Sequence, residues 1–247
     1  MTDKKNNYLL MRKIFITALI AAFIASCAGT TENTMTVAGK VKGLKKGTLY
    51  LQHIVDTSLI NIDSLVVKGD GTFSFSTEIE SPEIFYLYLN KKDNNDINDR
   101  IMFFGEPGEI TINTAWNTFD LNASIEGSKS QDKLSEYQKV MSRFNTQNLE
   151  YIKSSLNPKA QNNQEMMDSL QALSDRNVKR GYLFALNFAM NNTDSYIAPY
   201  IALKEVSDAN IKYLDSINNA LSPEVANSKY GKELNQFITN QKSSQEK

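Results

Sequence analysis

The side chains that could do chemistry are few in this sequence. Its 247 residues include one cysteine, Cys27, and one histidine, His53. A single histidine excludes multi-His zinc sites and His-dependent triads unless a partner supplies the remaining groups. His53 lies in a predicted strand on the same side as Leu49 and Leu51, where a lone histidine is more often structural than catalytic. We therefore expect no catalytic residue, no metal site and no cofactor.

Cys27 ends a segment that is organised like a secretory signal peptide. A basic start precedes an apolar stretch over residues 14–24, which is shorter than the roughly 20 residues of a membrane-spanning helix. The residues Ile24-Ala25-Ser26-Cys27 resemble the bacterial lipobox, whose cysteine is acylated and becomes the new N-terminus. We expect palmitate or a similar acyl chain on Cys27 to hold the protein stably on a membrane. A secreted protein with a cysteine near the cleavage point is the alternative, and Met11 is an alternative start.

Two aromatic residues are candidates for ligand contact. Trp116 and Phe119 lie in a polar segment over residues 113–122. Exposed rings there could stack on a sugar or a partner, whereas buried rings would cover the end of the core, which we favour.

Acidic and hydroxyl side chains give weaker signals. The loop with Asp93, Asp96 and Asp99 is rich in oxygen ligands, but it lacks the glycine and closing glutamate of a calcium-binding EF-hand loop. We interpret it as a solvated loop. Three Asp-Ser-aliphatic triplets resemble an O-glycosylation signal of some Gram-negative envelopes, although chance and helix capping also produce them. Their serines are Ser64, Ser169 and Ser216.

The first half of the chain has the period of β-strands. Over residues 35–127, apolar and polar residues alternate between turns rich in Gly, Pro and Asn, which predicts an antiparallel β-sandwich or open barrel. Gly69-Asp70-Gly71 predicts a hairpin turn. The stretch over 84–89 is apolar on both faces, so we expect a strand that is covered on both sides.

The second half, over residues 128–240, has the period of helices. Ser128 to Gln131 fits a capping box that starts the first helix, and a second long helix is expected over about 163–190. Ser222-Pro223-Glu224 predicts the start of a final helix that ends near Asn240 and leaves a polar tail over 241–247. The fold class is therefore α+β. A signal peptide over 1–26 and a tether over 27–34 precede the two halves, which we expect to form one structural unit because no flexible linker separates them.

The order of several short motifs resembles a known domain of unknown function. That domain forms the N-terminal part of many Gram-negative thiol-disulfide oxidoreductase lipoproteins. The matching segments are 36–44, 47–51, 63–64, 71–75, 106–109, 125–128, 195–200 and 221–232. Those relatives continue into a thioredoxin-like domain with a Cys-x-x-Cys pair, whereas this sequence stops at Lys247. The resemblance thus implies a stand-alone accessory domain and carries over no catalytic residue.

We expect a non-enzymatic lipoprotein of the cell envelope that acts as an interaction or binding module, anchored in the outer membrane and facing the periplasm. One alternative is an accessory subunit of a separate thioredoxin-like oxidoreductase, and another is a glycan- or ligand-binding lipoprotein. Nucleic acid is not an expected partner, because 27 basic and 28 acidic side chains leave a net charge of −1.

Overall fold

The computed structural model describes residues 33–55, 57–91 and 99–245. Within it, the chain from Asn33 onward forms one compact unit. The expected signal peptide, the lipidation of Cys27 and most of the aspartate loop lie outside the described residues. None of the described helices is both long and apolar enough to span a bilayer.

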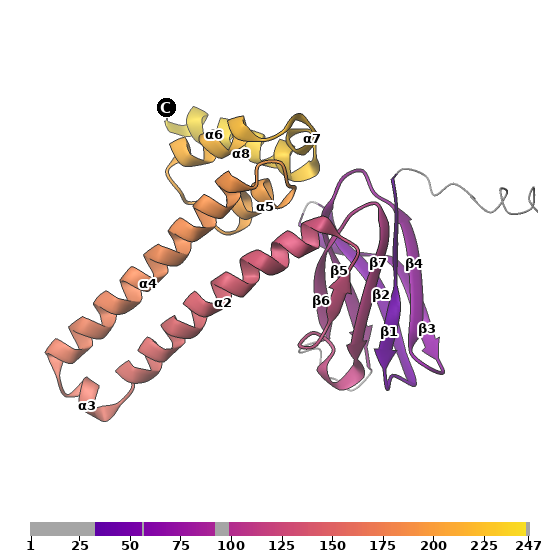
Figure 1. The fold of residues 1–247 in the computed structure, drawn as a ribbon, viewed down its shortest axis with the longest axis horizontal. Coiled ribbons are helices and arrows are strands. Elements are labelled where there is room, and N and C mark those ends of the chain that lie inside the picture. The colour runs from indigo at the N-terminus through magenta and orange to yellow at the C-terminus, as the bar shows by residue number, and fades with distance from the viewer. Residues whose placement is uncertain (1–32, 56, 92–98, 246–247) are drawn as a thin grey trace, which may run out of the picture. The chain divides into compact units, whose positions relative to one another are not determined.

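The described strands form two facing four-stranded sheets, which confirms the predicted sandwich (Figure 1). In the first sheet the order is β4 (Thr72–Glu78), β1 (Thr34–Lys42), β7 (Gly108–Ala115) and β8 (Ser124–Glu126). In the second sheet it is β3 (Ser58–Lys68), β2 (Lys46–Val55), β5 (Glu83–Asn90) and β6 (Arg100–Gly105). Neighbouring strands are antiparallel, except that β1 and β7 run parallel.

The predicted hairpin at Gly69-Asp70-Gly71 is wrong, because this turn carries the chain from β3 in the second sheet to β4 in the first. Gly71 is bonded to β1 through its carbonyl oxygen, which accepts from Val41 N at 2.8 Å. At φ +81°, a Cβ on Gly71 would lie 2.1 Å from the Val41 oxygen. This close approach to β1 leaves no room for a Cβ, so the position requires glycine.

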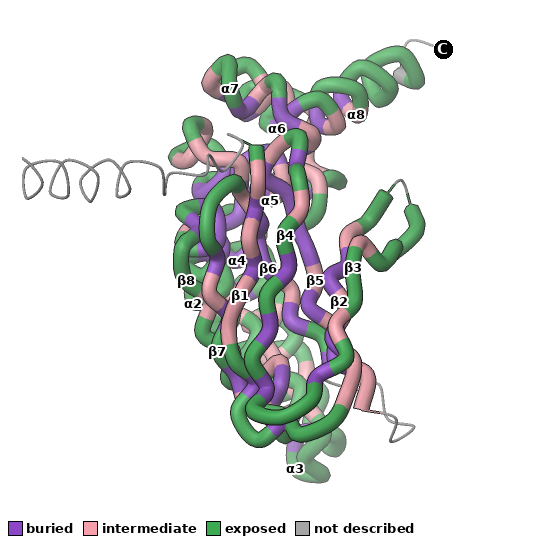
Figure 2. Tube along the Cα trace, turned by 90° about the vertical axis from the view of Figure 1, so that its right-hand side faces the viewer, coloured by how far each residue is buried: buried purple, intermediate pink, exposed green. Residues whose placement is uncertain are grey.

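Strand β5 is covered on both faces at its start, as its apolar sequence predicts, while Tyr86 and Tyr88 farther along its outer face are half-buried. Phe85, Leu87 and Leu89 point into the core between the sheets. On the opposite face, Ile84 packs with Phe104 of β6 in a second core that the helices complete. Burial alternates along β4, where Phe73 and Phe75 are buried between exposed neighbours (Figure 2).

The helical half begins with a long antiparallel hairpin of α2 and α4, closed by the short α3 (Figure 1). As predicted, Ser128 caps α2, accepting from Gln131 N at 3.0 Å. The Glu106 carboxylate adds bonds from Lys129 N and from the Ser130 hydroxyl, at 2.8 Å for the latter. The helices are α2 (Lys129–Ser155), α3 (Pro158–Gln161), α4 (Gln164–Asn191), α5 (Ile197–Lys204), α6 (Ile211–Ala220), α7 (Pro223–Ala226) and α8 (Lys229–Gln245).

The final helix differs from the prediction. Ser222 caps only the single turn of α7, and α8 then starts afresh and continues to Gln245, past the expected end at Asn240. Ser228 ends the first segment and starts the second, because its hydroxyl donates to Val225 O at 2.6 Å and accepts from Gly231 N at 3.2 Å. The Ser81 hydroxyl, before β5, accepts from Lys229 N at 3.0 Å and fixes α8 to the sandwich.

Candidate functional site

The outer face of the second sheet is divided into two parts. Helices cover the part around Ile84 and Phe104. Farther along the strands, the register places Tyr50 of β2, Tyr88 of β5 and Arg100 of β6 in one row. The two tyrosines are half-buried and Arg100 is exposed. We call this row the tyrosine–arginine row.

The side chains of the tyrosine–arginine row are held in place by one another. The Tyr50 and Tyr88 rings stack with centroids 5.8 Å apart, and the Arg100 guanidinium carbon lies 5.0 Å from the Tyr88 ring centroid. Arg100 Nε donates to Gln52 Oε1 at 3.2 Å, and Gln52 Nε2 donates to Asn61 Oδ1 at 2.7 Å. Gln52 is only 7% exposed, so its amide is a fixed link between the guanidinium and Asn61.

Arg100 also lines a pocket of about 240 Å³ at the β6 edge, here called the Arg100 pocket. Strand β6 contributes Arg100 and Met102, helix α2 contributes Gln131, Ser135 and Gln138, and the segment around β8 contributes Asp120, Ala123 and Ile125. Asp120 Oδ1 is buried and has no hydrogen-bond partner. Because a buried carboxylate oxygen without a donor is unfavourable, this atom is a polar group that the fold leaves unsatisfied.

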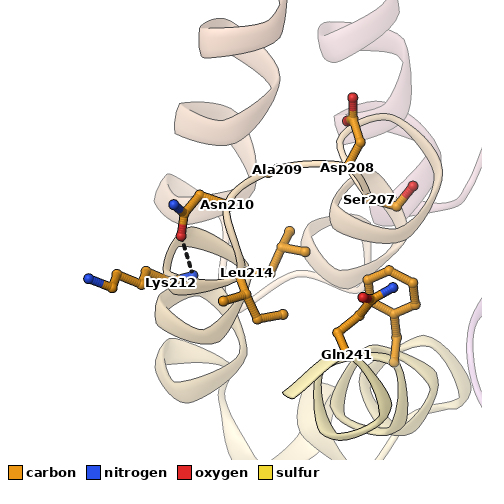
Figure 3. A pocket seen from close by; sticks show the side chains of 9 residues that line it. Ser207, Asp208, Ala209, Asn210, Lys212, Leu214 and Gln241 are labelled. Atoms are coloured by element: carbon orange, nitrogen blue, oxygen red, sulfur yellow. Dashed lines mark hydrogen bonds between the residues drawn. The ribbon is translucent and has the colours of Figure 1, made fainter. Parts of the chain in front are cut away.

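A larger pocket of about 480 Å³ lies between the segment before α6 and the end of α8 (Figure 3). Two of its polar side chains, Asn210 and Asp208, have structural partners. Asn210 caps α6 by accepting from Lys212 N at 3.0 Å, the bond drawn in Figure 3. Asp208 Oδ1 accepts from the Tyr182 hydroxyl at 3.0 Å. These two bonds hold the segment before α6 in place.

The α2–α4 hairpin has an exposed apolar face. All buried residues of α2 lie in its first turns, between Ser130 and Tyr137. Beyond them Leu149, Ile152 and Leu156 are exposed, with Leu149 at 64% and Leu156 at 67%. Asn145, Leu149, Ile152 and Leu156 follow one another at steps of three or four residues, which puts them on one face of the helix. Asn145 also lines a shallow groove of about 180 Å³, together with the exposed Val178 of α4.

His53 lies at the end of β2, opposite Phe85, on the face predicted from Leu49 and Leu51. Its ring stacks on Phe85 with centroids 5.6 Å apart. The Glu83 carboxylate lies between His53 Nδ1, at 3.8 Å, and the Lys229 ammonium, with which it is hydrogen-bonded. The cluster joins β2 and β5 to α8, which gives His53 a packing role.

The two aromatic candidates separate in the structure. Phe119 is buried in the sandwich core, so it covers the end of the core and is not accessible to a ligand. Trp116 is 47% exposed and rests on Gly43, where a Cβ would lie 2.7 Å from the indole ring. A ligand contact of Trp116 stays a prediction. Trp116 begins a short 3-10 helix (Trp116–Thr118) directly after β7.

The remaining candidates are not brought together. Ser64 on β3, Ser169 on α4 and Ser216 on α6 are all exposed, and their O-glycosylation stays a prediction. Asp99, the described end of the aspartate loop, is buried and forms an ion pair with Lys91. Among residues 33–55, 57–91 and 99–245, no group of three or more His, Cys, Asp or Glu side chains could hold a metal ion.

The sequence reasoning missed Tyr50, Tyr88, Arg100 and Asp120. One signal was present: on β5, Tyr86 and Tyr88 alternate with Phe85, Leu87 and Leu89, so one of its two apolar faces carries hydroxyl groups. That pattern indicates a face that is only partly buried.

The strands and the start of α2 coincide with a known sequence family. Residues 35–134 match the family model described as Domain of unknown function (DUF4369). The chain contains a DUF4369 domain. This domain ends at Leu134 in α2 and thus includes the tyrosine–arginine row, Asp120 and Gln131, but not the distal hairpin. No curated protein and no solved structure matches the chain.

Proposed function

We propose that this protein is a non-enzymatic lipoprotein of the cell envelope, anchored through Cys27 and facing the periplasm from the outer membrane. Its folded part is a binding module that docks an envelope protein. The signal peptide and the lipobox-like Ile24-Ala25-Ser26-Cys27 support the location. The DUF4369 domain is compatible with the resemblance to the N-terminal part of thiol-disulfide oxidoreductase lipoproteins.

The exposed apolar face of the hairpin is the observation that carries the binding role. Leu149 and Ile152 of α2 and its C-cap residue Leu156 follow one another at helical spacing and leave large apolar surfaces in water. Contiguous exposed apolar residues mark interaction sites, and burying one such side chain contributes about 1.5–3 kcal/mol. The partner that fits is an amphipathic helix, which would lay its apolar side along this face.

Site-specific photocrosslinking in intact cells tests this role. With p-benzoylphenylalanine at Ile152 of the lipidated chain, we expect one discrete adduct. Leu183 is the matched control, because it is also an exposed apolar residue but lies two residues beyond Gly181, which faces α2. A probe at Leu183 should give no such adduct.

The double variant Leu149→Gln, Leu156→Gln removes the apolar face at exposed positions and should abolish the adduct from Ile152. Mass spectrometry of the adduct then identifies the partner. A thioredoxin-like protein would make this chain its accessory subunit. No adduct from Ile152, or the same adduct from both probe positions, would rule out docking at this face.

A further inference from the structure

Trp116 is held in place by the fold although it is nearly half exposed. The turn between β1 and β2 is closed by a hydrogen bond from Leu44 N to Val41 O at 3.2 Å, and its Gly43 has φ +80°. The pyrrole part of the indole lies against Gly43, where a Cβ would be 2.7 Å from the ring atom Cδ1. Glycine therefore makes room for the ring, while 47% of Trp116 stays exposed. The indole is a preformed surface on which a ligand ring can stack.

Two lysines lie beside this indole without acidic partners. Lys42 and Lys45 stand on either side of Gly43 in the turn, and Lys42 is the register partner of Ala115, the residue before Trp116. Both lysines are exposed, and neither forms an ion pair within the described part of the chain. Their ammonium groups are therefore available to an acidic group of a ligand that rests on the indole.

A second pair of lysines adds positive charge at the same end of the sandwich. Lys46 at the start of β2 lies directly opposite Lys68 at the end of β3. Like charges in such a cross-strand pair are unfavourable. Lys40 is neutralised by Asp70 at 3.0 Å, whereas no acidic side chain among the described residues pairs with Lys46 or Lys68. A bound anion would offset the repulsion that the fold leaves between these two lysines.

The outer face of the first sheet continues from this end as a row of hydroxyl groups. On β4, Thr72, Ser74 and Ser76 are exposed, and the residues between them point into the core. Thr72 is the register partner of Lys40 on β1, so the row begins at the lysines. Hydroxyl groups both donate and accept hydrogen bonds, as the hydroxyl groups of sugars do. The aromatic ring, the lysines and the hydroxyl row together match a polymer of sugars that carry acidic groups.

We propose that Trp116, Lys42, Lys45, Lys46 and Lys68 form a binding site for an anionic polysaccharide, here called the tryptophan–lysine site. The apolar face of one sugar ring stacks on the Trp116 indole, and its acidic group pairs with Lys42 and Lys45. Acidic groups of neighbouring units pair with Lys46 and Lys68, and the hydroxyl row on β4 binds sugar hydroxyls. This surface is part of the sandwich and is separate from the apolar face of the α2–α4 hairpin.

Fluorescence titration of the full lipoprotein in detergent tests this site, because Trp116 is the single tryptophan. The probes are polygalacturonate, alginate and chondroitin sulfate. We expect at least one of them to shift the emission of Trp116 and to bind more weakly at high salt, because exposed charges are screened.

Three comparison ligands each lack one feature of the proposed ligand. Polyglutamate has charge without rings, maltoheptaose has sugar rings without charge, and oligothymidylate has charge and rings but few hydroxyl groups. Each should bind at least tenfold more weakly than the best polysaccharide. If none of the three polysaccharides binds, or if any comparison ligand binds as tightly, the proposal is overturned.

Lysine variants assign the charge contacts. The double variant Lys42→Gln, Lys45→Gln should weaken binding about tenfold and reduce its salt dependence. The double variant Lys139→Gln, Lys153→Gln is the matched control, since it removes two exposed lysines from α2 and should leave the affinity unchanged. Equal affinities of the two double variants contradict the assignment.

Two substitutions of Trp116 separate stacking from general apolar contact. Trp116→Phe keeps an aromatic ring and should keep most of the affinity, whereas Trp116→Leu should lose about tenfold. Calorimetry measures both affinities because these variants lack the indole signal, and circular dichroism verifies that they are folded. Similar affinities of the phenylalanine and leucine variants would exclude stacking at this position.

Discussion

Gln131 connects the start of α2 to the edge of the second sheet. Its Oε1 accepts from the backbone N–H of Phe104 at 2.8 Å, and its Nε2 donates to the Ser135 hydroxyl at 3.1 Å. The capping-box pattern instead assigns this side chain to the N-cap backbone. The edge strand β6 offers a buried N–H that needs an acceptor, and Gln131 supplies it.

Gln131→Leu should lower the free energy of unfolding by about 1–3 kcal/mol, because it leaves the Phe104 N–H buried without a partner. Urea denaturation measures the change. Gln138→Leu, on an exposed position of the same helix, is the control and should stay near the wild-type value. Equal stability of the two variants would show that the Phe104 bond contributes little.

Cys27→Ser tests the anchor. The hydroxyl cannot form the thioether to the lipid, so incorporation of radioactive fatty acid should be lost and an unprocessed or soluble form should accumulate. Ser26→Ala, which keeps a small residue before the cysteine, should be labelled like the wild type. Unchanged membrane attachment of Cys27→Ser would contradict lipidation at this position.

At the scale of elements, tyrosines form the joint between the second sheet and the helices. Tyr200 and Tyr230 pack edge-on against Phe104, at centroid distances of 5.9 and 6.2 Å. The Tyr230 hydroxyl accepts from Ile84 N at 3.1 Å. Tyr137 of α2 donates to Glu205 at 3.1 Å, and burial and this carboxylate raise its pKa. The joint therefore depends on neutral phenols.

The joint should weaken in alkali. Burial raises the pKa of Tyr200 to about 12 from an ordinary value of 10.0, and within the helical region burial together with Asp208 raises that of Tyr182 to about 12 as well. Below pH 10, the folded and the unfolded protein both keep the phenolic protons of Tyr200 and Tyr182. Between pH 10 and 12 the unfolded chain loses them first, so stability falls as pH rises.

Denaturant unfolding at several pH values, with tyrosinate absorbance, measures this loss. Tyr200→Phe removes one phenol, whose hydroxyl lies 4.0 Å from the Met102 sulfur, so this variant should lose less stability over the same pH interval. An identical alkaline loss in this variant would exclude Tyr200 as a contributor.

At the scale of the whole molecule, the sandwich and the helices share a core. Phe104→Ala should cost about 3–5 kcal/mol and destabilise both halves together. Trp116 is the single tryptophan and lies in the sandwich, so its fluorescence follows that half, while far-UV circular dichroism follows the helices.

The two signals should change in one coincident transition in the wild type and in Phe104→Ala. A fragment of residues 34–127 should aggregate, because Ile84 and Phe104 lose their cover. Separate transitions, with a soluble and folded fragment, would show two independent domains.

The sequence predicts those structural features, such as strands and helix caps, that depend on residues close together in the chain. Alternation revealed the strands, and Ser128 and Asn163 cap the two long helices near the expected starts. Pairing between distant strands left no local signal, so the parallel pair β1–β7 and the crossing at Gly71 escaped prediction. The Arg100 site was missed for the same reason, since its side chains come from β2, β5, β6 and α2 and meet only after folding.

The central claim is that the outer face of the second sheet has two parts, one buried under helices and one that the helices leave half-exposed. Hydroxyl-radical footprinting of the purified lipoprotein, read by mass spectrometry, tests it most directly. We expect Tyr50 and Tyr88 to be oxidised well above Tyr137 and Tyr230, which are 3% and 6% exposed. Equal oxidation of all four tyrosines, or protection of Tyr50 and Tyr88 alone, would contradict this division of the face.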